Sequence, residues 1–201
     1  DEIKLFTTWI QQGARYEKHW AFVKPQKVNL PATGDKDWQK NEIDHFTLAK
    51  MEEKGLAPNE EAEKEILLKR VSLDLTGLLP SVEMMDAFAA DKSKDAYENA
   101  VDKLLNTAQY GEKMAVHWLD LARYSDSYGY QDDNIRTQWP YRDWLIHAFN
   151  KNMGYDEFIT WQLAGDLLPN AGKEQILATA FLRNHKYTEE GGVIPEEYRV
   201  E

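Results

Sequence analysis

The sequence predicts an all-α fold: an irregular multi-helix bundle with an extended N-terminal linker and a loop-like C-terminal tail. Apolar residues recur at three- and four-residue spacing through most of the 201 residues, which is the period of an amphipathic helix. Alternating runs rich in β-branched residues, which are typical of strands, are nearly absent. The connections between helical patterns are short, as they are in helical bundles.

The first element that the pattern predicts is a short amphipathic helix over residues 2–12. Ile3, Phe6 and Ile10 recur at helical spacing, and Gly13 suits the residue after a helix end. A helix this short is marginal in water when it stands alone. We therefore expect its apolar side to need a partner.

A linker follows, because the helical period stops between Val23 and Lys40. Pro25, Pro31 and Gly34 lie there among polar residues, which favours an extended segment. The sequence thus predicts three parts: a short N-terminal remnant, a linker and a helical domain. Their expected boundaries are 1–18, 19–40 and 41–201.

Eight further helices are predicted along the third part, each from the apolar residues that recur along it. The expected apolar positions are Ile43, Phe46 and Ala49; Leu67, Val71, Leu75 and Leu78; Met84 and Phe88; Tyr97, Val101, Leu104 and Leu105; Met114, Trp118, Leu121 and Ala122; Tyr141, Leu145, Ala148 and Phe149; Ile159, Leu163 and Leu167; Ile176, Leu177, Ala180 and Phe181. Gly77 suits a helix end, Ser81 and Ser93 suit N-caps, and Pro140 suits a first helical turn. The segment from Lys186 to the C-terminus is polar and carries no such pattern.

Composition excludes several classes of function. The formal net charge of −11 repels the phosphates of nucleic acids and anionic lipids, so neither is an expected partner. The absence of cysteine excludes disulfides, thiolate zinc sites, iron–sulfur clusters and covalently bound haem in this stretch. No apolar run approaches the roughly 20 residues that a transmembrane helix needs.

The run from His117 to Asp126 is the first candidate site. Helical rotation places His117, Asp120 and Tyr124 on one stripe beside an apolar stripe. A His and an Asp three residues apart can hydrogen-bond, which would orient a base or a metal ligand. The commoner role of such a pair is structural, as a tie between helices at the edge of the core.

The second candidate is the loop from Ser125 to Trp139. Asp126, Asp132 and Asp133 supply three carboxylates, and calcium prefers six to eight oxygen ligands. The spacing is not that of an EF-hand. The alternative interpretation is that these aspartates stabilise turns.

The third candidate lies in the tail, where Glu190 and Glu197 flank a Gly-containing stretch. Paired carboxylates are what glycoside hydrolysis requires, whereas solvated loop charge is the commoner explanation. Asp166 adds an acid near a helix end, where the helix dipole disfavours negative charge. We expect a cation, Arg142 or Arg183 to neutralise it.

Several segments of the chain resemble the planctomycete-type cytochrome-c-associated domain, a domain of unknown function (1549). The segments that carry the resemblance are residues 41–46, 68–80, 110–112, 117–124, 141–144, 162–166 and 178–184. It covers residues 19–201. Residues 1–14, with Trp9-Ile10 and Gly13-Ala14, are similar to the last helix of the small cytochrome c domain that often precedes this one.

The resemblance implies a context more than a mechanism. Proteins of this family are large, are exported to the periplasm or cell envelope, and occur in bacteria that degrade polysaccharides. The family continues after the segment 196–200 to a Cys-x-x-Cys-His motif, so haem c is expected in the parent protein and not in this stretch, which would be truncated at its C-terminus. The resemblance brings no established catalytic set. The candidates at matched positions are His117, Asp120, Arg123, Asp126, Asp166, Glu190 and Glu197.

Three hypotheses about function follow. The preferred one is a docking or scaffold module that contacts neighbouring haem-containing domains of the same polypeptide, in a redox system associated with polysaccharide degradation. The alternative is a carbohydrate-active hydrolase or oxidoreductase that acts on glycan, and it requires Asp120, Asp126, Asp166 and Glu190 to converge. The third is a structural domain stabilised by calcium.

Overall fold

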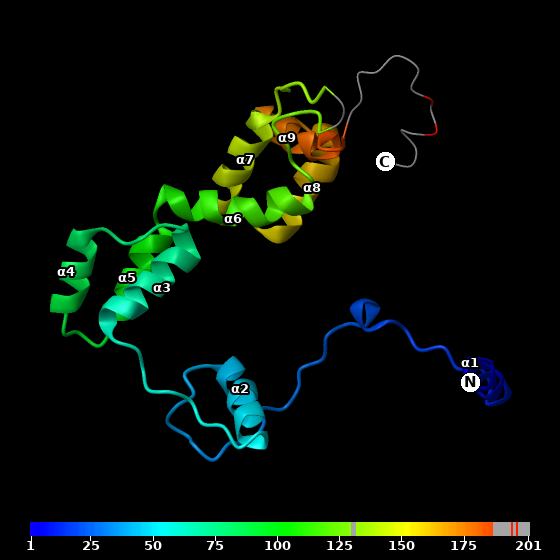
Figure 1. The fold of residues 1–201 in the computed structure, drawn as a ribbon. Coiled ribbons are helices and arrows are strands. Elements are labelled where there is room, and N and C mark those ends of the chain that lie inside the picture. The colour runs from blue at the N-terminus through cyan, green and yellow to red at the C-terminus, as the bar shows by residue number, and fades with distance from the viewer. Residues whose placement is uncertain (130–131, 187–193, 195, 197–201) are drawn as a thin grey trace. The chain divides into compact units, whose positions relative to one another are not determined.

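The structure, a computed structural model, describes residues 1–129, 132–186, 194 and 196. Within these residues it contains nine α-helices, three 3₁₀ helices and no β-sheet, so the predicted all-α fold is confirmed (Figure 1). The chain divides into two compact units, Asp1–Glu61 and Ala62–Glu201. The finer division at residues 18 and 40 stays a prediction.

The first unit contains two α-helices and one 3₁₀ turn. Its elements are α1 (Glu2–Gln11), η1 (Trp20–Phe22) and α2 (Glu42–Glu53). The second unit contains the other nine elements. They are α3 (Lys64–Thr76), α4 (Val82–Ala90), α5 (Ala96–Leu105), α6 (Ala108–Leu121), α7 (Trp139–Asn150), α8 (Tyr155–Ala164), η2 (Gly165–Leu167), α9 (Lys173–Ala178) and η3 (Thr179–Arg183).

Helix α1 forms where the sequence predicts it, but it buries none of its residues. Ile3, Phe6 and Ile10 are 83%, 62% and 63% exposed. The hydrogen bonds that its threonine side chains make are also local, since the hydroxyls of Thr7 and Thr8 donate to carbonyls one turn earlier in the same helix. Local signals thus specify α1 while its apolar stripe stays in water.

Helix α2 begins with a complete capping box. The Asn41 side chain accepts from the backbone N–H of Asp44, and the Asp44 carboxylate accepts from the backbone N–H of Asn41. Its buried residue is Leu48, whereas the predicted face is wrong, because Ile43 and Phe46 are exposed. Residues 24–33, which lie before it, form neither helix nor strand, as expected for the predicted linker.

Helices α3, α4 and α5 pack around a first small core in the second unit. Leu68 and Phe88 are buried there against two alanines of α5. The Gly77 end of α3 and the Ser81 N-cap of α4 are confirmed, since Gly77 has a φ of +73° and Ser81 Oγ accepts from Met84 N–H. The N-cap predicted at Ser93 is wrong, because Ser93 lies in a turn and α5 begins at Ala96.

The residues of α5 that are buried in this first core lie one position before those that the sequence predicts. Helix α5 buries Ala96 and Ala100 in place of Tyr97 and Leu105, which are 40% and 38% exposed. Small residues let helices approach closely, so the alanines take the contact and the larger neighbours lie at its rim. Leu78 is likewise exposed, because it lies beyond the end of α3.

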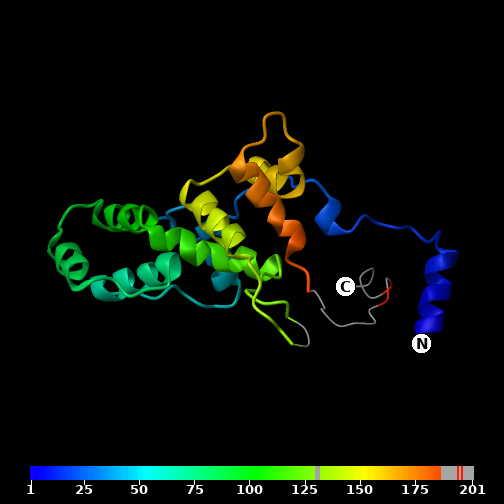
Figure 2. The same cartoon turned by 90° about the horizontal axis from the view of Figure 1, so that it is seen from above.

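Helices α6 to α9 enclose the larger core of the second unit. Tyr141, Leu145 and Ala148 of α7 are buried in it as predicted, together with Trp144 and Phe158. Helix α6 packs on α3 and on α7, and both views show one helical group at each end of it (Figures 1 and 2). Four residues predicted to be buried are exposed instead: Leu121, Leu163, Leu167 and Ile176.

In the described part of the chain, no helix combines the length and the apolar character that a membrane span needs.

Candidate functional site

The connection between α6 and α7 carries several polar contacts among its described residues. After α6 ends, Arg123 adopts a left-handed backbone with a φ of +57°, and Asp133 does the same with a φ of +48°. Such conformations cost free energy in residues other than glycine. The described parts of the loop fold back on themselves, with a bridge between Ser127 and Ile135 and a 2.9 Å bond from Arg136 N–H to Asp126 O.

A cluster of polar side chains lies where this loop meets α7. The Tyr124 hydroxyl donates to Asp126 Oδ1 at 2.6 Å, and Arg142 Nη1 lies 3.7 Å from the same oxygen. Burial, followed by the hydrogen bond to Asp126, raises the pKa of Tyr124 to about 12. At neutral pH Tyr124 therefore keeps its proton and acts as the donor to Asp126.

Asp133 acts within the loop. Its carboxylate accepts hydrogen bonds from the Ser127 side chain and, at 2.7 Å, from Gly129 N–H, and these bonds lower its pKa. Asp132 is exposed. Within the described ranges, no group of three His, Cys, Asp or Glu side chains gathers in a way that would hold a metal. A calcium site built on Asp126, Asp132 and Asp133 stays a prediction.

Beneath the loop lies a buried polar triad that joins three helices. Gln162 Oε1 accepts from Trp118 Nε1 at 2.8 Å and from the Tyr141 hydroxyl at 2.7 Å, while Gln162 Nε2 donates to Phe158 O. Burial raises the pKa of Tyr141, which keeps its hydroxyl a donor. The Tyr124 ring stacks on the Tyr141 ring with centroids 6.4 Å apart, so the triad contacts the first residues of the loop.

Sequence reasoning placed Trp118 and Tyr141 in the core but missed Gln162. Apolar periodicity favoured its neighbour Leu163, which is 54% exposed, whereas Gln162 is 1% exposed. The signal that was available is indirect: a buried Trp and a buried Tyr each need a hydrogen-bond partner.

The first predicted stripe is not formed as expected. His117 and Asp120 are both exposed on α6, and neither side chain hydrogen-bonds within the described residues. The inclusion of Tyr124 in the stripe is wrong, because α6 ends at Leu121 and the left-handed Arg123 turns the chain away first.

The remaining candidates lie elsewhere. Asp166 is exposed in η2 and forms no ion pair with Arg142 or Arg183, all three of which the structure describes. Neither arginine therefore neutralises Asp166, and neutralisation by a cation stays a prediction. Glu190 and Glu197 lie outside the described residues. The structure thus brings Asp126 to Tyr124 and Arg142 and gives Asp120 and Asp166 no such neighbours.

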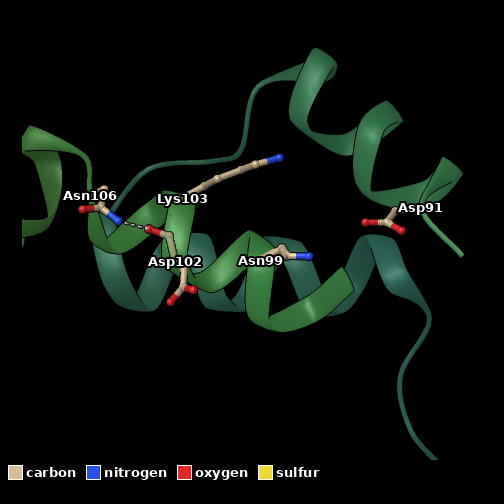
Figure 3. A pocket seen from close by; sticks show the side chains of 5 residues that line it. All are labelled: Asp91, Asn99, Asp102, Lys103 and Asn106. Atoms are coloured by element: carbon tan, nitrogen blue, oxygen red, sulfur yellow. Dashed lines mark hydrogen bonds between the residues drawn. The ribbon is translucent and has the colours of Figure 1, made fainter. Parts of the chain in front are cut away.

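A surface groove between α4 and α5 is a second feature that the sequence did not indicate. Its outer part has a volume of about 500 Å³ and is lined by Asp91, Asn99, Asp102, Lys103 and Asn106 (Figure 3). An inner part of about 260 Å³ has a mostly apolar wall. Figure 3 shows the Lys103 side chain extended along the groove, and its ammonium makes no hydrogen bond or ion pair within the described residues. Nothing in the lining of the groove selects a ligand.

The model of a family described as PSCyt2, a protein of unknown function (DUF1549), matches residues 42–201. No curated protein and no solved structure matches the chain.

Proposed function

The chain belongs to the PSCyt2 family of proteins of unknown function (DUF1549), and from this membership we propose that it is a docking module in a cytochrome-c-linked redox system. Its partner in this proposal is a neighbouring haem-containing domain of the same polypeptide. The proposal extends the resemblance seen in the sequence to a location in the periplasm or cell envelope and to a role in polysaccharide degradation.

The observation that carries the proposal is the uncovered apolar stripe of α1. Ile3, Leu5, Phe6 and Ile10 are each more than 60% exposed, and Trp9 is 42% exposed. Burying one large apolar side chain is worth about 1.5–3 kcal/mol, so five together provide a strong drive to associate. A single exposed Leu or Ile is ordinary on a protein surface, whereas five on one ten-residue helix indicate a contact surface.

The helix itself also favours a partner. An isolated helix of ten residues is marginal in water, because the cost of nucleation is spread over few hydrogen bonds. Docking of the apolar stripe would add the packing that the helix lacks. The acidic charge of −11 supports a partner whose docking face is basic, since complementary charge speeds association.

The experiment compares binding of the chain and of two variants to the separately produced haem-containing domain of the parent polypeptide. Phe6→Ser with Ile10→Ser removes two apolar side chains from α1. The matched control, Leu167→Ser, removes one that is 78% exposed in the second unit. Titration calorimetry is expected to show binding by the natural chain and by the control, and a loss of at least about tenfold in the α1 variant.

Equal affinity of all three proteins would contradict a role for α1. Absence of binding by the natural chain, tested with the haem domains on both sides, would contradict the docking function itself.

A further inference from the structure

The guanidinium of Arg136 makes an unusually complete set of bonds to one stretch of backbone. Nη1 donates to Arg183 O at 3.2 Å and to His185 O at 3.0 Å, and Nη2 donates to Asn184 O at 3.2 Å. Nε completes the set by donating to Ser125 O at 3.4 Å, within the loop itself. One side chain thus joins the loop between α6 and α7 to three successive carbonyls at the end of η3.

The electrostatics of this contact are favourable. The last carbonyls of a helical turn have no partner in the turn and carry partial negative charge. A guanidinium is always charged and presents its donors in a fixed planar fork, which suits several carbonyl oxygens at once. Arg136 therefore caps η3 from a segment 47 residues earlier in the chain.

Gln138 makes a second connection between the same two segments. It is 7% exposed, and its Nε2 donates to Ala180 O at 3.0 Å and to Asn184 Oδ1 at 2.8 Å. The two segments also lie close together at Gly129, since a Cβ placed there would lie 3.6 Å from Lys186 Cγ. Contacts from Arg136 and Gln138 thus converge on residues 180–185.

We propose that Arg136 and Gln138 form a polar latch that couples the loop between α6 and α7 to residues 180–186, so that both open and close as one unit. The latch fixes the point from which the chain continues beyond residue 186. Arg136 acts here as a positioning residue, and the proposal does not depend on the docking function.

The composition of the latch explains why it opens separately from the core. Its bonds are polar, and exposed Lys186 and His185 border it. Asn184 is 3% exposed, and its buried Nδ2 has no hydrogen-bond partner among the described residues. A buried donor without a partner costs free energy, so opening, which hydrates it, regains part of that cost.

Amide hydrogen exchange of the whole chain tests the latch. Tyr128 N–H, bonded to Asn134 O, reports on the loop, and Asn184 N–H, bonded to Phe181 O, reports on η3. Arg136→Ala is expected to speed exchange at both positions together by about tenfold, because the substitution removes the charged donor that bonds to both segments. Arg136→Lys keeps the charge but not the fork, so a smaller joint increase is expected.

The matched control is Arg142→Ala, which removes the arginine that lies beside Asp126 without a contact to residues 180–186. It is expected to leave exchange at Asn184 unchanged. Faster exchange at only one of the two positions in Arg136→Ala, or at neither, would overturn the proposal. Where Arg136→Ala does not fold, the same criterion applies to Arg136→Lys.

Discussion

The two units of the chain contain the same kind of helix but differ in what they bury. In Asp1–Glu61 the hydrophobic side chain that is buried is Leu48, whereas Ala62–Glu201 buries two clusters of hydrophobic residues. Helices α1 and α7 are similar in length, yet α7 buries four residues and α1 none. Local sequence therefore specifies both helices, and among the described residues burial stabilises only the second.

This difference indicates that the apolar residues of the second unit serve folding, whereas those of α1 serve association with a partner. The apolar residues of α7 are used inside the second unit, around a polar triad that fixes how its helices meet. Those of α1 remain available, and we propose that a haem-containing neighbour covers them. Substitutions in the second unit should therefore change stability, and substitutions in α1 should change association.

The largest expected effect comes from Gly165→Ala in the second unit. A Cβ at this position would lie 2.2 Å from the backbone oxygen of Gln175 in α9, so the backbone itself must move. Overpacking of this kind costs about 1–3 kcal/mol and sometimes more, and we expect the upper end of that range in urea unfolding. The control is Gly154→Ala, whose Cβ would meet only the Asp156 side chain at 3.0 Å. Equal stability of the two variants would show that η2 and α9 are not held this closely.

A smaller loss is expected from the polar triad. Gln162→Leu leaves the buried Tyr141 hydroxyl without its acceptor, which costs about 1–3 kcal/mol, whereas Trp118 Nε1 keeps its 3.1 Å bond to that hydroxyl. Tyr141→Phe keeps the bond from Trp118 to Gln162, so it should cost only about 1 kcal/mol. Chemical unfolding of both variants checks the order. The reverse order would mean that Gln162 is not the hub of the triad.

The sequence predicted the presence of the helices better than the faces that they bury. Tyr141 and Leu145 were placed correctly because α7 is apolar at regular spacing and is packed on several sides. Gln162 was missed, since its burial depends on donors that come from two other helices.

The loop was only partly predictable. Asp126 was recognised as an acid in a loop, but its contact with Arg142 requires α7 to be placed. The role of Arg136 was not foreseen, because three of its four partners lie 47 to 49 residues away and all four are backbone carbonyls, which carry no sequence signal.

The smallest expected effect is confined to alkaline pH. The pKa of Tyr124 is raised above its ordinary value of 10 to about 12, so the folded state favours the neutral phenol. Its contribution to stability is fully present below pH 10 and is lost as the pH rises towards about 12. Tyr124→Phe should remove this part of the alkaline loss, as unfolding followed across that range will show. An identical dependence of stability on pH in the variant would mean that the pKa of Tyr124 is not raised in the folded state.

Hydrogen exchange of the α1 amides, measured in the chain alone and with the haem-containing domain of the parent polypeptide, tests the central claim most directly. The account predicts that α1 alone exchanges far faster than α7, because it has no packing to protect its backbone, and that the partner slows it. Protection of α1 in the chain alone to the level of α7, or no change on addition of the partner, would contradict it.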